Sequence, residues 1–69
     1  MSEHVYKSVE ITGTSPEGVT QAIDRAIAKA SETVRNLDWF EVTSVRGQIV
    51  DGGVAHYQVT LKIGFRLED

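Results

Sequence analysis

Trp39, the one tryptophan of the chain, is the first candidate for a ligand-binding residue. In strand periodicity Phe40 and Val42 share one phase and Trp39 has the other, so we expect the first two to fill the core while Trp39 points away. An indole at a surface can stack on a flat, electron-poor ring such as a flavin isoalloxazine. The alternative, from residue type alone, is an ordinary core tryptophan.

Two polar residues have the chemistry to complete such a ligand site. The amide of Gln58 offers two donors and one acceptor, which match the polar edge of a flavin ring. Arg46, directly before a glycine, can bind a phosphate through two parallel hydrogen bonds. From spacing alone, a solvated glutamine and a surface ion pair are the alternatives.

The sequence gives little support to nucleophilic or metal-dependent catalysis. It has no cysteine and no serine in a Gly-x-Ser-x-Gly elbow, and His4 and His56 lack the spacing of metal-binding pairs. The loop at residues 13–15 is followed by Glu17, whose negative charge disfavours a phosphate site there. We therefore expect no enzymatic activity and no bound metal.

Composition further limits the partners. The chain has 69 residues, 25% of them charged, with a formal net charge of −3, so a nucleic-acid partner is not expected. No apolar run approaches the roughly 20 residues that span a bilayer, and the first residues lack signal-peptide features, which predicts a cytoplasmic protein. A chain this short without disulfides usually needs oligomerisation to be stable.

The elements that must position these residues begin with a strand over residues 4–12. A long helix is then predicted over residues 16–36, with small and apolar residues recurring every three or four positions. Ser15 is its expected N-cap, Pro16 its first position, and Glu17 is expected in the first turn.

The second half predicts two long strands joined by a tight turn. The first covers residues 38–50 and changes phase near Thr43-Ser44, which indicates a bulge. Asp-Gly-Gly at 51–53 is typical of a hairpin turn. The last strand, residues 54–68, alternates cleanly, and we expect it in the middle of the sheet.

This last strand has consequences for the shape of the molecule. At about 3.3 Å per residue it would be roughly 45 Å long, whereas a compact chain of this size is only about 25 Å across. The strand must therefore curve, extend into a neighbour, or both. The expected fold is α+β: a three-stranded antiparallel sheet packed around one long helix, with an open sheet edge available for subunit contacts.

Several motifs spread along the chain resemble the bacterial dodecins. They are Val-Tyr-Lys, Gly-Thr-Ser-Pro-Glu-Gly, Leu-Asp-Trp-Phe-Glu-Val, Val-Arg-Gly, Tyr-Gln-Val and Gly-Phe-Arg-Leu-Glu-Asp, in this order over about residues 4–69. The resemblance implies a single dodecin domain at 1–69, a β-α-β-β fold, a hollow homododecamer and flavins bound in pairs at subunit interfaces. It also implies that Trp39 stacks on the flavin, Gln58 anchors its ring and Arg46 reaches the phosphate of flavin mononucleotide (FMN), with Asp38 beside the stack.

The implied function is flavin storage or buffering, in which tryptophan stacking quenches the photoreactivity of FMN or riboflavin. Archaeal dodecins often have an acidic residue where this chain has Ser44 and lack Arg46, so FMN is expected to be preferred over riboflavin. The alternatives are a reservoir or carrier of coenzyme A, an oligomer without a ligand, and an enzyme that uses bound flavin as a redox cofactor. For coenzyme A, the resemblance suggests Lys7, Lys29 and Arg35 as contacts.

Overall fold

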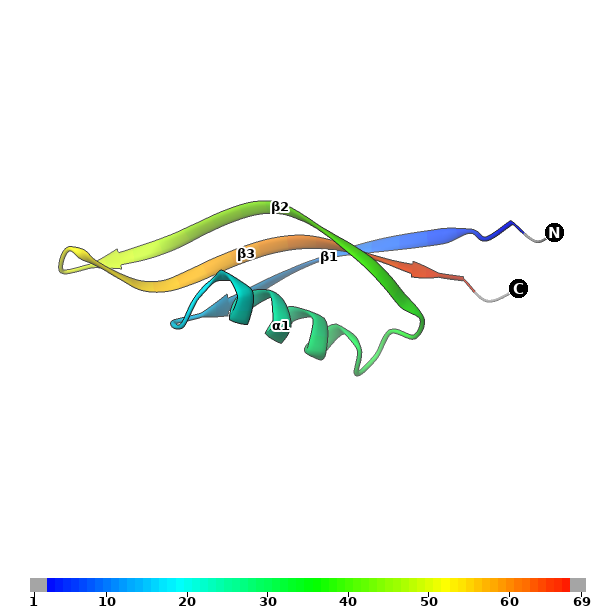
Figure 1. The fold of residues 1–69 in the computed structure, drawn as a ribbon, viewed down its shortest axis with the longest axis horizontal. Coiled ribbons are helices and arrows are strands. Elements are labelled where there is room, and N and C mark those ends of the chain that lie inside the picture. Colours follow the sequence, from blue (N-terminus) through cyan, green and yellow to red (C-terminus); the bar gives the residue numbers. More distant parts are fainter. Residues whose placement is uncertain (1–2, 68–69) are drawn as a thin grey trace.

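A computed structural model describes residues 3–67 as one helix lying on a three-stranded antiparallel sheet (Figure 1). The elements follow the order β1 (Tyr6–Ser15), α1 (Val19–Ala30), β2 (Leu37–Val50) and β3 (Gly53–Arg66), and the strands lie in the order β1-β3-β2. The β-α-β-β fold and the central place of the last strand are thereby confirmed. Each strand begins or ends within a few residues of its predicted limits.

The core is a thin layer between α1 and the two strands that it covers. Its buried members alternate along β3 or recur every four residues along α1; they are Ala22, Ala26, Ala30, Val59, Leu61 and Ile63. Alanines let the helix approach the sheet closely. At Gly13 of β1, a side-chain β-carbon would lie 2.9 Å from the Cβ of Ala26, so this close approach requires glycine.

The helix is shorter than predicted, and its predicted beginning at residue 16 is wrong. Ser15 is the last residue of β1, and its hydroxyl accepts a hydrogen bond from the backbone N–H of Glu17 at 3.0 Å. This bond closes a local turn and leaves the helix N-terminus without a serine cap. Gly18 precedes the helix with no side-chain cap, and Pro16 and Glu17 lie outside its first turn.

The predicted helix end at residue 36 is also wrong. Beyond Ala30 the backbone N–H groups of Glu32 and Thr33 donate to carbonyls three residues earlier, which tightens the chain into turns. Asn36 then adopts a positive φ of 65°, a conformation that asparagine tolerates better than most residues. This reversal leads the chain into Leu37, the first residue of β2.

The predicted bulge in β2 is confirmed by a register shift between Val42 and Ser44. Thr43 is the extra residue, and its hydroxyl donates a hydrogen bond to the backbone carbonyl of Thr60 at 3.1 Å. Because of this extra residue, Val42 and Val45 lie on the same face of the sheet although they are three positions apart.

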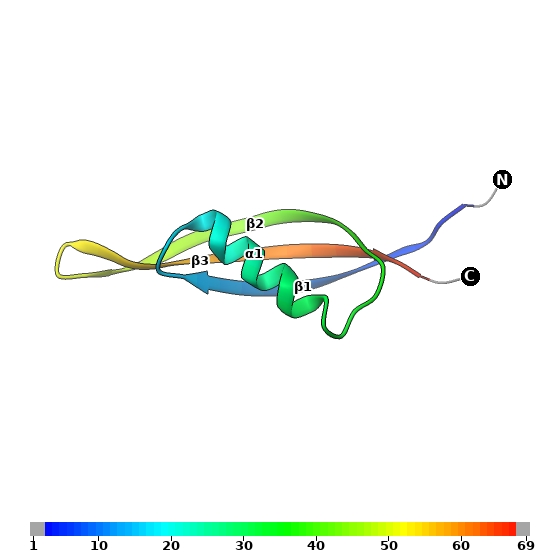
Figure 2. The ribbon, with the colours of Figure 1, turned by 60° about the horizontal axis from the view of Figure 1, so that its bottom comes forward.

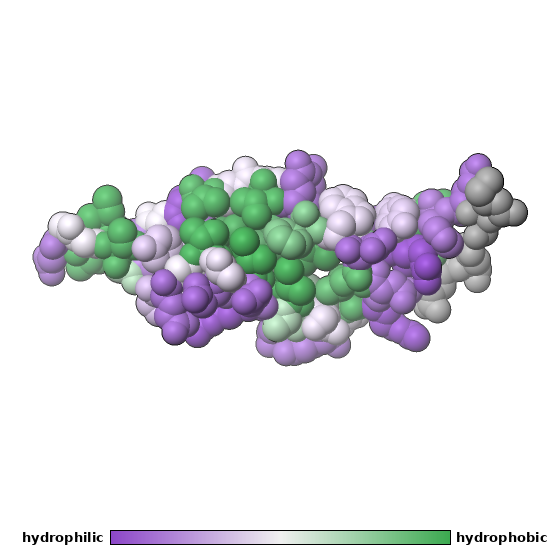
Figure 3. All heavy atoms as spheres, viewed as in Figure 1, coloured by the Kyte–Doolittle hydropathy of each residue, from purple (hydrophilic) through white to green (hydrophobic). Residues whose placement is uncertain are grey.

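The prediction that Phe40 and Val42 fill the core is wrong. Both lie on the helix side of the sheet, but α1 packs mainly against β1 and β3 and leaves most of β2 uncovered. Phe40 is therefore 48% exposed and Val42 38% exposed. Figure 3 shows apolar side chains gathered along the middle of one side of the molecule.

The paired strands β2 and β3 extend beyond α1 as an arm, residues 46–58, whose outer part has no β1 partner (Figures 1 and 2). The molecule measures 56 × 20 × 14 Å, and its radius of gyration of 14.5 Å exceeds the ~11 Å expected for a compact chain of this length. The last strand therefore extends past the compact part of its own molecule. Its expected extension into a neighbouring subunit stays a prediction.

The turn at the tip of the arm gives a first test of the backbone conformation. Asp51 and Gly52 both have positive φ, 50° and 77°, as expected for an Asp-Gly hairpin turn. Gly52→Ala should lower the free energy of unfolding by about 1 kcal/mol in urea denaturation, because a side chain is strained in this conformation. Gly53→Ala is the control, since its added β-carbon would meet no neighbour closer than 3.9 Å. Equal stability of the two variants would contradict this account of the turn.

Candidate functional site

The residues predicted to bind a ligand stand on the sheet face away from α1, here called the open face. Along β3, the residues between the buried Val59, Leu61 and Ile63 point to this face. The strand register places Trp39 opposite Gly64 and Arg46 opposite Gln58, both on the open face.

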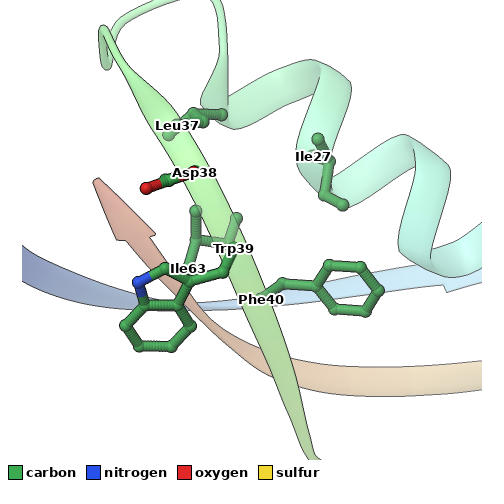
Figure 4. Close-up of a pocket in the computed structure, with 6 residues that line it drawn as sticks. All are labelled: Ile27, Leu37, Asp38, Trp39, Phe40 and Ile63. Carbon is green, nitrogen blue, oxygen red and sulfur yellow. The ribbon is translucent and has the colours of Figure 1, made fainter. Parts of the chain in front are cut away.

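Trp39 lies against the sheet at a position where the neighbouring strand has no side chain. A β-carbon built on Gly64 would overlap three atoms of the indole, so the ring lies with one face against this glycine. Figure 4 shows Trp39 and Phe40 pointing to opposite sides of β2. Trp39 is 44% exposed and points away from the core, as predicted from its phase. The rest of the ring is free to stack.

Asp38 lies beside Trp39 at a second register shift in β2, between Leu37 and Trp39. A shallow pocket of about 140 Å³ opens here, lined by Ile27, Leu37, Asp38, Trp39, Phe40 and Ile63 (Figure 4). Sites for drug-sized ligands typically measure about 300–1,000 Å³. This pocket is therefore too small for a tricyclic ring, and three of its lining residues, Ile27, Phe40 and Ile63, lie on the helix side of the sheet and not on the open face.

Arg46 and Gln58 are brought together by the register of the arm. As directly paired residues of neighbouring strands, they have β-carbons about 5 Å apart. An amide and a guanidinium thus stand side by side on the open face, so a neutral polar edge and an anion can bind close to each other.

Trp39 and Gln58, in contrast, are not brought together within one chain. The residue opposite Trp39 is Gly64, which lies six positions from Gln58 along β3, or about 20 Å. No single flavin ring reaches both side chains of the same chain. The two halves of the predicted site are therefore separate surfaces of the protomer.

Arg66 is a candidate that the sequence interpretation missed. It shares the strand phase of Gly64 and so lies near the indole on the open face. A polar pocket of about 210 Å³ beside it is lined by Asn36, Leu37, Asp38 and Arg66. The alternation of the last strand, extended by one step beyond Gly64, was the signal that would have found it.

The basic residues suggested for coenzyme A lie at the end of the molecule opposite the arm or on the helix. Lys7 stands opposite Phe65, and Arg35 and Phe65 line a groove of about 280 Å³ after α1. Lys29 forms an exposed ion pair with Glu32 at 3.5 Å. Lys7 and Arg35 thus border the same apolar ring, whereas Lys29 already has a partner.

Residues 3–67 also bear on metal binding and membrane insertion. In that range no three histidine, aspartate or glutamate side chains lie together in a way that could hold a metal ion. None of the helices in the same range has the length and apolar character needed to cross a membrane.

Comparison with known proteins identifies the family. The dodecin family model matches residues 5–68. The chain belongs to the dodecin family. A dodecin of Thermus thermophilus is 57% identical over 65 residues, which cover 94% of each chain. The resemblance seen in the sequence motifs is thereby confirmed.

Solved dodecin structures agree with the fold along the whole chain. The dodecin of Streptomyces coelicolor is 64% identical and superposes with a TM-score of 0.93, covering 100% of this chain and 99% of its own. That of Streptomyces davaonensis is 60% identical with a TM-score of 0.93, covering 99% and 100%. The long β2–β3 pair and the single helix are thus features shared with other dodecins.

Proposed function

We propose that this dodecin stores flavin, holding FMN against Trp39 at contacts between subunits and quenching its photoreactivity, without turnover. The observation that carries the proposal is the half-exposed indole, which lies with one face on Gly64 and presents its remaining surface on the open face. Aromatic rings stack favourably on such a surface, and close indole contact quenches an excited flavin by electron transfer. Membership of the dodecin family supports the same function.

The separation of Trp39 from Gln58 supports a site built from more than one subunit. Because about 20 Å divides the two within a chain, Trp39 of one copy would cover the ring while Gln58 of another donates to its polar edge. Arg46 would hold the phosphate, and Asp38 would line the stack. The assembly that we propose is a hollow homododecamer, as the sequence resemblance implies.

The surface of the isolated chain supports such an assembly. Its accessible area is 5028 Å², whereas a compact monomer of 7.6 kDa exposes about 4,300 Å². The excess, roughly 700 Å², reflects the elongated shape of the chain and leaves surface that subunit contacts can cover. Much of the exposed apolar surface lies on β2, for example at Phe40 and Val45.

Native mass spectrometry of protein purified without added ligand tests this function most directly. We expect a mass of twelve chains that carries flavin, and flavin absorbance released on denaturation. A colourless assembly that takes up no added flavin would contradict the proposal and favour a purely structural oligomer.

Arg46 should set the preference for FMN over riboflavin. Arg46→Ala removes hydrogen bonds to a charged phosphate, each worth about 1.5–3 kcal/mol, so FMN affinity should fall by about tenfold or more while riboflavin affinity is kept. Titration of flavin fluorescence measures both. Arg46→Lys keeps the charge but loses the paired donors, so its FMN affinity should lie between those of the unaltered protein and Arg46→Ala. Equal losses for both flavins would show that Arg46 does not contact the phosphate.

Coenzyme A remains a second candidate ligand because two cations flank Phe65: Lys7 pairs with it across the strands, and Arg35 lines the same groove as its ring. Two cations next to an apolar ring suit a ligand with phosphates and an adenine. The mass of the bound molecule in the native spectrum distinguishes coenzyme A from flavin.

A further inference from the structure

The open face of the arm carries four hydrogen-bonding side chains in a compact block. Arg46 stands opposite Gln58, and Gln48 stands opposite His56, with no register shift between the two pairs. Residues two apart on a strand are about 7 Å from each other, and paired residues about 5 Å. The block is therefore about the size of one hydrated anion with its ligands.

Among residues 3–67, no carboxylate belongs to this block or pairs directly with one of its members. The nearest acidic residues facing the same way are Glu41 and Glu10, which flank Lys62, four positions or about 13 Å from Gln58 along β3. Asp51 lies in the turn at the tip of the arm. On this face, an anion bound at Arg46 would therefore lie closer to hydrogen-bond donors than to a carboxylate.

The donors of the block are also free to bind a ligand. Among residues 3–67, none of these four side chains makes a hydrogen bond or ion pair with another residue that the structure describes. Gln58 and His56 are half-buried, whereas Arg46 and Gln48 are exposed at the β2 edge. The imidazole of His56 therefore lies close to the sheet, and the longer, exposed side chain of Arg46 stands near it on the neighbouring strand.

We infer that His56 and Gln48 are specificity-determining residues that bind the phosphate of the stored flavin together with Arg46. This inference rests on the proposed function and extends it to residues that neither the sequence motifs nor the family resemblance marked. A phosphate has three terminal oxygens, and the Arg46 guanidinium satisfies at most two of them in a paired contact. An imidazole N–H from His56 and an amide N–H from Gln48 supply donors for the third. Riboflavin has no phosphate and gains nothing from either residue.

The test compares FMN with riboflavin in fluorescence-quenching titrations of the assembled protein. His56→Ala should weaken FMN binding by about fivefold to tenfold, the effect of losing one hydrogen bond to a charged group at a partly exposed site. Riboflavin binding should stay the same. His56→Gln, which keeps a donor, should recover most of the FMN affinity. Gln48→Ala should also weaken FMN binding and leave riboflavin binding unchanged. It removes the donor that β2 is proposed to supply to the same phosphate.

Thr14→Ala is the matched control. Thr14 pairs with Gln58 from the β1 side, so the variant removes a polar group that is as close to Gln58 as Arg46 is but lies on the other side of β3 from Arg46 and Gln48. It should leave both affinities unchanged. Size-exclusion chromatography confirms for each variant that assembly is kept, and a His56 variant that does not assemble is replaced by Gln48→Ala.

The outcomes separate this inference from the function on which it rests. If the unaltered protein quenches neither flavin, the proposed function fails and the inference falls with it. If it binds both flavins and the ratio of their affinities is the same in His56→Ala and Gln48→Ala as in the unaltered protein, flavin storage stands and the inference is overturned. A loss confined to FMN and restored by His56→Gln supports it.

Discussion

Trp39→Ala is expected to abolish flavin quenching and to weaken flavin binding by at least about thirtyfold. This corresponds to about 2 kcal/mol, the usual minimum cost of truncating an aromatic residue that dominates a binding site. In the proposed site the indole would supply both the stacking surface and the electron donor, so affinity and quenching should be lost together. Fluorescence titration measures both, and size-exclusion chromatography should show that the variant still assembles.

Two further variants show whether the effect belongs to this indole. Trp39→Phe keeps an aromatic ring of smaller area and should lose part of the affinity. Phe40→Leu changes the adjacent aromatic residue, which points to the other side of β2, and should keep flavin binding. If Trp39→Ala retains both affinity and quenching, the assignment of the ligand site is wrong.

Gly13→Val should lower the free energy of unfolding by about 3 kcal/mol, the upper part of the usual range for overpacking a core. The added β-carbon would collide with the backbone carbonyl oxygen of Ala22 and would lie 2.9 Å from the Cβ of Ala26. A backbone oxygen cannot rotate away, so α1 would have to move off β1. Urea denaturation measures the change.

Thr14→Val is the matched control for this prediction. It lies next in β1, is exposed, and points to the opposite face, where a β-branched side chain suits a strand. Its unfolding free energy should change by less than about 0.5 kcal/mol. Equal stabilities of Gly13→Val and Thr14→Val would show that the helix does not depend on this close approach.

The strands could be predicted well because their signals are local. The alternation of β3 around Leu61, the bulge at Thr43 and the Asp51-Gly52 turn are each encoded within a few residues. The helix ends were missed because side chains there favour turns: Ser15 bonds to the backbone two residues on, and Asn36 takes a left-handed conformation. Apolar periodicity alone does not reveal that competition.

The placement of the candidate site residues could be predicted only in part. Trp39 was assigned to an outward position from strand phase, which needs no knowledge of other elements. Its distance from Gln58 depends on the register of β2 against β3, and a register shift separates their pairing positions. Likewise, the exposure of Phe40 depends on which strands α1 covers, a long-range choice that the sequence pattern of β2 does not contain.

The contact between the indole of Trp39 and Gly64 limits how many ligand rings the protein could stack. One side of the aromatic plane is already occupied by the backbone of its own sheet, so only the other side remains for a guest. Each subunit therefore has one indole face on which a ligand ring can stack. If flavins bind only by this stacking, at most one flavin can bind per subunit. The storage capacity of the assembly would then follow directly from how many copies it contains.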